Sequence, residues 1–206
     1  ALKAPDRAEF VKAMAKEITD HCERKHWEIM ARSKVPQGHK VLPAVWAMRR
    51  KRRIDTRQVY KHKARLNVHG GKQEHGVNFW ETYSPVVNWF SIRLFLILAI
   101  LHTWATLQID FVLAFPQADI ECDMYMELPR GFHIPNVRSK DVVLLLKKNL
   151  YGQKQAGKVF GDHVKAGLTQ IGFAPSKIDP CVYYRKQTIL LLYVDDGILT
   201  GPSIKD

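Results

Sequence analysis

Two adjacent acids interrupt the apolar stretch TILLLYVDDGILTG, which spans residues 188–201. Buried carboxylates are costly unless a cation or a set of hydrogen bonds compensates them, so Asp195 and Asp196 need a partner. Asp110 has the same setting, because it ends the apolar run ATLQID and is followed by more apolar residues. Three carboxylates gathered at neighbouring strand ends would repel one another, which makes a bound divalent cation the expected partner.

Mg²⁺ suits such a set, because it prefers oxygen ligands and completes its shell with substrate phosphates. Two such ions roughly 3.5–4 Å apart stabilise the attacking and leaving oxygens in phosphoryl or nucleotidyl transfer. Two other interpretations remain open at this point. Residues 195–197 also fit an ordinary polar hairpin turn, and a pair of carboxylates also fits a hydrolase such as a glycosidase. Metal dependence would separate the hydrolase from a metal-dependent transferase.

The formal net charge is +12, and its placement matters more than its size. Residues 32–72 contain thirteen Lys or Arg and a single acid, Asp55, so this segment alone carries the whole excess. Apolar residues are interleaved with the charges, which predicts a folded basic lobe that binds a phosphate backbone. A solvated face and a nuclear-import signal are the alternatives. The densest candidates for binding nucleic acid are Arg49, Arg50, Lys51, Arg52 and Arg53.

Composition favours a globular protein of a reducing compartment. Apolar residues make up 46% and charged residues 25% of the 206 residues. The longest apolar run, residues 94–101, is far shorter than the roughly 20 residues that cross a bilayer, and the chain opens without a signal-peptide pattern. Three scattered cysteines do not form a disulfide framework, and the stretch HCERKH is a poor zinc finger. We therefore expect an intracellular protein without membrane partners.

The apolar periodicity predicts helices packed on an antiparallel sheet, an α+β domain. Asp6 and Glu9 resemble a capping box, and Phe10, Met14 and Ile18 form a helical stripe that continues to Cys22. Strands are predicted over residues 41–46 and 58–68, joined by a charged turn.

The later elements follow from the same patterns. A buried helix over 91–104 is predicted to begin at Ser91, because the segment is apolar on nearly every side. Strands are predicted over 105–110, 124–129 and 141–148, and a helix follows over 159–171. Residues 181–201 predict three short antiparallel strands, with turns at Lys186 and Gln187 and at Asp196 and Gly197.

The stretch LLLYVDDGILTG resembles the active-site hairpin of reverse transcriptases, in particular those of copia-type retrotransposons. Other motifs follow in the order and spacing of that family over residues 45–201. YKHKARLNVHGG resembles its fingers segment, and ETYSPVVNWFSIRLFLILAI resembles its loop and long helix. LQIDFVLAFPQADIECDMYMELPRGF resembles its first acidic motif, and LKKNLYGQKQAGKVFGDHV resembles its template- and nucleotide-contacting motif. AFPQAD departs from the usual asparagine-glycine turn after the first acid.

The resemblance implies an RNA-directed DNA polymerase (reverse transcriptase) that works by two-metal nucleotidyl transfer. Its substrates would be deoxynucleoside triphosphates and an RNA or DNA template-primer. Asp110 and Asp195 would ligate two Mg²⁺ ions, with Mn²⁺ as a substitute, and Asp196 would support them.

The resemblance also assigns substrate contacts. Lys63 and Arg65 fall where the fingers grip the triphosphate, and alternate positions on a strand do point the same way. Phe115 matches the bulky residue that closes off the sugar 2′-position, and Gln155 matches a glutamine near the incoming nucleotide. Tyr193 would lie by the primer end. By pattern alone, Lys63 and Arg65 also fit a solvated charge run, and Phe115 fits a core aromatic residue. Gln155 also fits an ordinary helix position, and Tyr193 fits simple strand packing.

By resemblance the chain divides into a helical segment over residues 1–31, a basic fingers-like region over 32–90 and a palm-like region over 91–206. The family's remaining palm strands, primer grip and thumb would follow Gly201, so we expect these 206 residues to extend primers poorly. The functional alternative is a non-catalytic remnant of a mobile element that still binds nucleic acid through residues 32–72. A cytoplasmic particle or the nucleus is the expected location, and the sequence predicts no oligomeric state.

Overall fold

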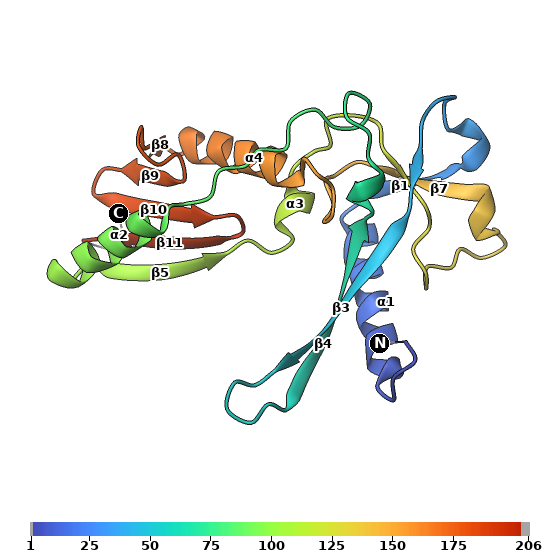
Figure 1. Cartoon of the computed structure of the whole chain (residues 1–206), viewed down its shortest axis with the longest axis horizontal. Helices are drawn as coiled ribbons and strands as arrows, with labels where there is room; N and C mark the ends of the chain where they lie inside the picture. Colours follow the sequence, from blue (N-terminus) through green and yellow to red (C-terminus); the bar gives the residue numbers. More distant parts are fainter. Residues whose placement is uncertain (1, 203–206) are drawn as a thin grey trace. The chain divides into compact units, whose positions relative to one another are not determined.

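The computed structural model describes residues 2–202, which form two compact units. Unit 1 comprises residues 1–80 and 115–156, and unit 2 comprises residues 81–114 and 157–206. Each unit is therefore built from two separated stretches of the chain. Helices and sheets occur in both units, and the strands pair antiparallel except for one parallel pair in unit 1, which confirms the α+β class (Figure 1).

Unit 1 is organised around a four-stranded sheet in the order β1-β7-β6-β2. Its core packs the apolar side chains of these strands against the inner end of a long hairpin, with Leu42, Leu66 and Leu144 fully buried. Three of the five residues of β7 (Val143, Leu144 and Leu146) are buried, in agreement with the predicted buried strand, and the other two are half-buried. The strands and helical turns of this unit are β1 Trp27–Ala31, η1 Arg32–Lys34, β2 Val41–Leu42, β3 Ala44–Arg52, β4 Val59–Val68, η2 Gly70–Lys72, β6 Tyr125–Met126, η3 Ser139–Asp141 and β7 Val142–Leu146.

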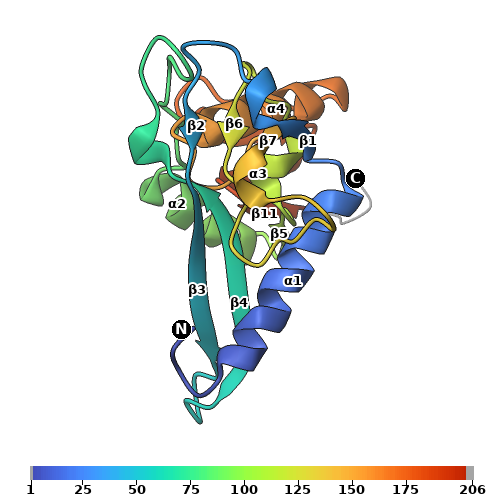
Figure 2. The same cartoon turned by 90° about the vertical axis from the view of Figure 1, so that its right-hand side faces the viewer.

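Strands β3 and β4 pair antiparallel as a long two-stranded hairpin, and helix α1 (Arg7–Glu23) runs alongside it (Figure 2). The predicted stripe is confirmed for Phe10, Met14 and Ile18, which are buried, whereas Cys22 is exposed and His21 is buried in its place. The capping box is wrong. Asp6 makes no side-chain cap, because its carboxylate binds Arg50 of the hairpin instead.

Unit 2 contains a fully antiparallel sheet in the order β5-β11-β10-β9-β8. The three predicted strands over 181–201 are present, and the turn at Lys186 and Gln187 is confirmed. The second turn lies at Val194 and Asp195 rather than at Asp196 and Gly197, because Asp196 already pairs with Tyr193. The strands are β5 Ala105–Asp110, β8 Ala174–Pro175, β9 Val182–Arg185, β10 Thr188–Tyr193 and β11 Asp196–Gly201.

Helix α2 (Trp89–Leu101) accompanies this sheet, and helix α4 (Ala156–Gln170) follows a short helix, α3 (Ala114–Gln117), along the chain. Phe111, just beyond β5, meets Phe160 of α4 edge to face at 5.6 Å. Among residues 2–202, no helix is both long enough and apolar enough to cross a bilayer.

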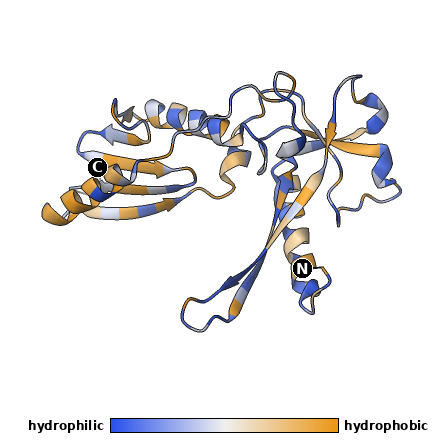
Figure 3. Ribbon diagram, viewed as in Figure 1, coloured by the Kyte–Doolittle hydropathy of each residue, from blue (hydrophilic) through white to orange (hydrophobic). Residues whose placement is uncertain are grey.

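The prediction that the apolar helix is buried is wrong. Only Ala99 of α2 is fully buried, and Phe90 and Ile100 are 72% and 79% exposed. Most of the helix is hydrophobic (Figure 3). Packing one side of it on the sheet therefore leaves apolar residues on the opposite side exposed. Its N-cap is Asn88, which accepts a hydrogen bond from the backbone of Phe90, and not Ser91.

Ser91 instead helps to fix the start of α2 to the strand β9 through Asp179. This carboxylate is 7% exposed and accepts hydrogen bonds from the Ser91 hydroxyl at 2.6 Å and from the backbone of Asn88 and Cys181. Burial raises the pKa of Asp179, but these hydrogen bonds outweigh it and hold the pKa below the ordinary 3.8.

Candidate active site and nucleic-acid interface

The sheet of unit 2 brings the three acids together from positions about 85 residues apart in the sequence. Asp110 ends β5 and is the register partner of Asp196, the first residue of β11. Asp195 occupies the turn between β10 and β11, and its carbonyl accepts a hydrogen bond from the backbone of Phe111 at 2.8 Å. Directly opposed residues share a face of an antiparallel sheet at about 4.5–5.5 Å between Cβ atoms, so the carboxylates of Asp110 and Asp196 start from neighbouring points.

The turn that carries Asp195 is conformationally unusual. Val194 has a φ of 57°, which a β-branched side chain rarely adopts because its Cβ crowds the backbone. Such strain costs free energy and persists only where the surrounding structure enforces it. Here the strand pairing on both sides enforces it, since Tyr193 and Asp196 are still in register. The hairpin therefore fixes the position of Asp195 tightly at the end of the sheet.

The donor set of this site fits a hard divalent cation. Asp110 and Asp196 are exposed, and none of the three acids forms an ion pair with a residue between 2 and 202. Uncommitted carboxylate oxygens are the ligands that Mg²⁺ prefers. In the described part of the chain, however, no three acid, histidine or cysteine side chains are already gathered as a ligand set. The strand pairing brings the backbones of the three acids close together, but their carboxylates do not yet point to one common position.

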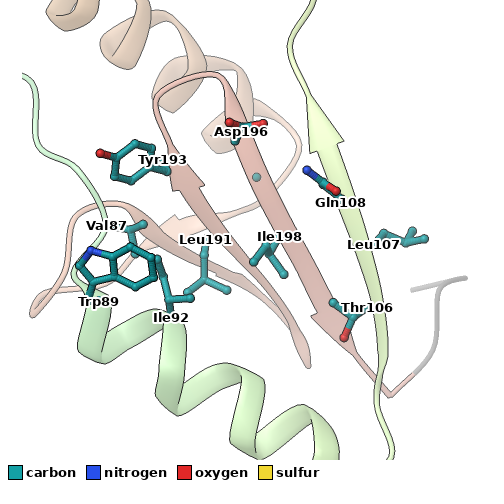
Figure 4. Close-up of a pocket in the computed structure, with 11 residues that line it drawn as sticks. Val87, Trp89, Ile92, Thr106, Leu107, Gln108, Leu191, Tyr193, Asp196 and Ile198 are labelled. Atoms are coloured by element: carbon teal, nitrogen blue, oxygen red, sulfur yellow. The ribbon is translucent and has the colours of Figure 1, made fainter. Parts of the chain in front are cut away.

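A cavity of about 710 Å³ lies beside the acids within unit 2. Apolar side chains from α2 and the sheet line most of it, including Trp89, Ile92 and Leu191, while Tyr193 and Asp196 lie at its hairpin end (Figure 4). Tyr193 is 49% exposed, so its ring is accessible from solvent next to Asp196.

The β3–β4 hairpin of unit 1 carries most of the basic residues of segment 32–72, and those on its strands lie on two opposite faces. Register pairs are Arg49 with Lys63 and Lys51 with Lys61, while Arg65 lies opposite Ala47 on the same face. We call Arg49, Lys51, Lys61, Lys63 and Arg65 the cation ladder. None of these five residues forms an ion pair with any residue in the described range 2–202. Opposed like charges destabilise a hairpin, which indicates a surface for a polyanion.

The opposite face of the hairpin is covered by α1 and uses its charges internally. Arg50 donates two hydrogen bonds to Asp6, at 2.6 and 2.7 Å, and His62 contacts the same carboxylate at 2.7 Å. The Arg50 guanidinium, the first of these partners, helps to hold the pKa of Asp6 well below its usual range. Arg50 is thus occupied within unit 1, although the sequence placed it among the nucleic-acid contacts.

The other two predicted contacts, Arg52 and Arg53, lie at the outer end of the hairpin. Arg52 donates to the carbonyl of Arg57 across the tip, at 2.9 Å, and the backbone N–H of Arg53 donates to the Gln58 carbonyl. Both side chains are exposed. They belong to the tip rather than to the cation ladder.

The inner end of the cation ladder meets an aromatic stack. The Arg65 guanidinium lies 3.8 Å from the centre of the Tyr151 ring, and the same ring lies 4.9 Å from that of Phe115. Burial lowers the pKa of the neighbouring Lys63, and the charges of Arg65 and Lys51 lower it further. Three of the predicted substrate contacts, Lys63, Arg65 and Phe115, therefore belong to one region of unit 1.

Gln155, the fourth substrate contact in unit 1, is 3% exposed and accepts a hydrogen bond from Gln73 at 2.9 Å. The acids and Tyr193 belong to unit 2, so the predicted site residues are divided between the two units.

In the part of the chain that the structure describes, the stretch HCERKH does not gather three metal-ligating side chains. His21 and His26 are buried with their Nδ1 atoms 2.7 Å apart, and Trp27 stacks on the first ring. Burial, followed by the charge of His21, lowers the pKa of His26 to about 4. The stacked and hydrogen-bonded rings of these two histidines lie where the end of α1 meets the start of β1.

Sequence reasoning missed Asp6, Gln73, Tyr151 and Lys61. Asp6 matched a local capping rule, and that match hid its long-range partner. Gln73 carried no signal, because a single glutamine after a glycine pair fits any turn. Alternation along β4 could have found Lys61, which lies two residues before Lys63 and thus shares its face.

Comparison with known proteins agrees with the motifs. Residues 25–206 match the model of the family described as reverse transcriptase (RNA-dependent DNA polymerase). The chain is 34% identical over 205 residues to the retrovirus-related Pol polyprotein from transposon TNT 1-94 of Nicotiana tabacum, covering 97% of the chain and 15% of that protein. It is 32% identical over 206 residues to the Pol polyprotein from transposon RE1 of Arabidopsis thaliana, covering 98% of the chain and 14% of that protein.

A more distant relative is the transposon Ty1-ER2 Gag-Pol polyprotein of Saccharomyces cerevisiae, 27% identical over 207 residues, with 97% of the chain and 11% of that protein covered. The chain thus spans only about a seventh of the length of the first two relatives. These matches confirm the predicted resemblance to copia-type retrotransposon polymerases.

Proposed function

Because the chain belongs to the reverse transcriptase (RNA-dependent DNA polymerase) family, we propose that it contributes the palm and fingers of an RNA-directed DNA polymerase. Unit 2 would act as the palm that carries the acids, and the hairpin of unit 1 would act as the fingers. The reaction would extend a primer on an RNA or DNA template, using deoxynucleoside triphosphates. As the chain is a small part of its relatives, activity, substrates and partners are inferred for this segment.

The observation that carries the proposal is the register pairing of Asp110 with Asp196, next to Asp195 in the turn. Polymerisation needs acidic side chains at one point, and the strand pairing supports the proposal because it brings the backbones of these three residues to the same end of the sheet. Asp110 and Asp195 would hold two Mg²⁺ ions, or Mn²⁺ in their place, while Asp196 would support them. When bound, such ions neutralise charge on the attacking and leaving oxygens.

In the proposed reaction the primer 3′-hydroxyl oxygen bonds to the α-phosphorus, and the bond from that phosphorus to the β-phosphate oxygen breaks. The hydroxyl proton leaves to solvent, and pyrophosphate departs. The protein contributes orientation and fixed charge rather than a covalent intermediate. Tyr193, half exposed beside Asp196, would contact the primer end.

Unit 1 would bind the incoming nucleotide. Lys63 and Arg65 would contact the triphosphate, since both are cations on one face of β4 without an ion-pair partner in the described chain. Stacking on Tyr151 limits the motion of the Arg65 guanidinium and keeps its donors pre-positioned. Phe115, packed on the same tyrosine, would close off the sugar 2′-position, and Gln155 would lie near the nucleotide.

The outer cation ladder would bind the nucleic-acid backbone. Arg49, Lys51 and Lys61 repeat along two paired strands, so their charges recur every two residues, or roughly 6.8 Å. A regular row of cations matches a regular row of phosphates and carries no sequence preference.

Single-nucleotide addition by the purified chain tests the proposal. We expect Mg²⁺-dependent, template-directed extension of a primer by one nucleotide, abolished by Asp110→Asn and by Asp195→Asn. Asp123→Asn is the matched control, because Asp123 is an exposed acid of unit 1 and lies outside the proposed site. Extension that survives both active-site variants would refute the assignment of the acids.

A second candidate function is a nucleic-acid-binding remnant without catalysis. The cation ladder favours this candidate, because the ladder is complete without the acids of unit 2. Nucleic-acid binding of the unmodified chain, together with no addition of even one nucleotide in Mg²⁺ or Mn²⁺, would favour this candidate.

A further inference from the structure

Two glycines bring the turn after β4 against the loop before α4. Gly152 has a φ of 85°, and a Cβ on it would collide with the carbonyl oxygen of Val68. A Cβ on Gly70 would collide with the carbonyl oxygen of Gly152 in turn. Only residues without a side chain allow this approach of the two backbones. As a result Gln73, just after η2, reaches the segment that contains Gln155.

The hydrogen bonds of Gln73 permit a single orientation of its amide. Its Oε1 accepts from the backbone N–H of Lys154 at 2.8 Å, so the oxygen must lie on that side. Its Nε2 donates to the carbonyl of Asn78 at 3.3 Å and to Oε1 of Gln155 at 2.9 Å. Reversing the amide would place an NH₂ group against the Lys154 N–H and an oxygen against the Asn78 carbonyl.

Gln73 therefore decides the orientation of Gln155. Because Gln73 offers a donor, Gln155 must present its oxygen, and its own Nε2 then points elsewhere. That Nε2 is buried and has no hydrogen-bond partner among residues 2–202, in a residue that is 3% exposed. An unpaired buried donor is unfavourable, and few survive in native proteins without a reason.

We propose that Gln73 is a positioning residue, which turns Gln155 so that both N–H donors of its amide are reserved for an acceptor oxygen of the bound nucleotide. This inference rests on the proposed function, in which Gln155 lies near the incoming nucleotide. The amide is covered in the substrate-free chain, so the contact forms when the covering side chains move aside on binding. The orientation is set beforehand by Lys154 and Asn78, through Gln73, and needs no substrate.

Gln73→Glu is the decisive variant, because it changes one group and keeps the shape. A carboxylate still accepts from the Lys154 N–H but cannot donate to Gln155, whose amide must then turn over and donate to residue 73. The control is Lys72→Gln, which changes the net charge by the same amount at an exposed neighbouring position. Thermal unfolding of each variant checks that the fold is retained.

The first readout is the side-chain amide spectrum of the nucleotide-free chain labelled with ¹⁵N, with the Gln155 signals identified by their loss in Gln155→Met. We expect one Gln155 amide proton to move downfield in Gln73→Glu, where it gains a hydrogen bond to a carboxylate, and not in Lys72→Gln. An unmoved Gln155 signal would overturn the inference. This readout does not depend on nucleotide binding and is therefore separate from the proposed function.

The second readout is equilibrium binding of Mg²⁺–deoxyadenosine triphosphate to the 206-residue chain. Gln73→Glu and Gln155→Met should each weaken binding about tenfold, the value of roughly one lost hydrogen bond to a charged group. The double variant should be no weaker than either single variant, because both remove the same contact. Fully additive losses would overturn the inference, whereas no binding by the unmodified chain would count against the proposed function and leave the spectral result standing.

Discussion

Neutralising the outer cation ladder should reduce the salt dependence of nucleic-acid binding by a predictable amount. The variant replaces Arg49, Lys51 and Lys61 by glutamine and keeps Lys63 and Arg65, so the proposed nucleotide contacts remain. All three side chains lie on the hairpin face opposite α1, and none forms an ion pair in the described part of the chain. Their removal should therefore leave no buried charge unpaired.

The magnitude follows from counterion release. Each phosphate contact to a single strand contributes about 0.7 to the slope of log affinity against log salt, so three lost contacts lower the slope by about 2.1. Between about 50 and 200 mM salt, a fourfold change, this corresponds to roughly 18-fold. The unmodified chain should thus lose about 18-fold more affinity over this range than the variant does.

The assay is fluorescence anisotropy with a labelled single-stranded oligonucleotide at several salt concentrations. The matched control removes three positive charges from exposed lysines away from the hairpin. These residues are Lys140, Lys165 and Lys177. An equal change of slope in both variants would show that only net charge matters, and an unchanged slope in the ladder variant would show that the ladder is a solvated face.

Two further predictions concern stability. Asp179→Asn should lower the free energy of unfolding by about 1.5–3 kcal/mol near neutral pH, because it weakens hydrogen bonds to a buried carboxylate. Since the folded pKa of Asp179 is depressed, its contribution should be full above about pH 3.8 and fall as the pH drops below that value, so acid unfolding curves of the two proteins should converge there. Ile100→Gln should change the free energy of unfolding by less than about 0.5 kcal/mol in denaturant titration, because Ile100 is 79% exposed, whereas a buried isoleucine would cost several times more.

The sequence predicted the elements whose cause is local. Alternation and β-branched runs were sufficient for β4, β5 and the strands around the acids, since a strand needs only its own pattern to be recognised. The expectation that Asp110 and Asp195 lie close together rested on both acids ending β-strands, and the pairing of β5 with β11 agrees with it, although the register itself is a long-range property. The turn was misplaced by two residues, because the glycine at position 197 is a strong turn signal and Val194 is an improbable residue for a positive φ.

The sequence could not predict burial where it depends on a neighbour. The α2 segment is apolar on all sides, which normally means a buried helix, yet packing on one face of a single sheet covers only part of it. Periodicity reports how apolar a face is and contains no information about whether another element reaches it. The exposed side of α2 could therefore not be predicted from its sequence.

Asp6 and Gln73 show why the positioning residues escape a sequence analysis even when the functional residues do not. Asp6 fits a capping-box pattern, because Glu9 follows three residues later. Its carboxylate instead accepts two hydrogen bonds from Arg50 and contacts His62, which stabilises the charge more than one backbone N–H would. Gln73 reaches Gln155 only because Gly70 and Gly152 allow the turn after β4 and the loop before α4 to approach closely. In both cases the partner is set by the tertiary approach of separate segments. Motifs identify the groups that contact substrate, and the hydrogen-bond geometry of the folded chain is needed to identify the residues that orient them.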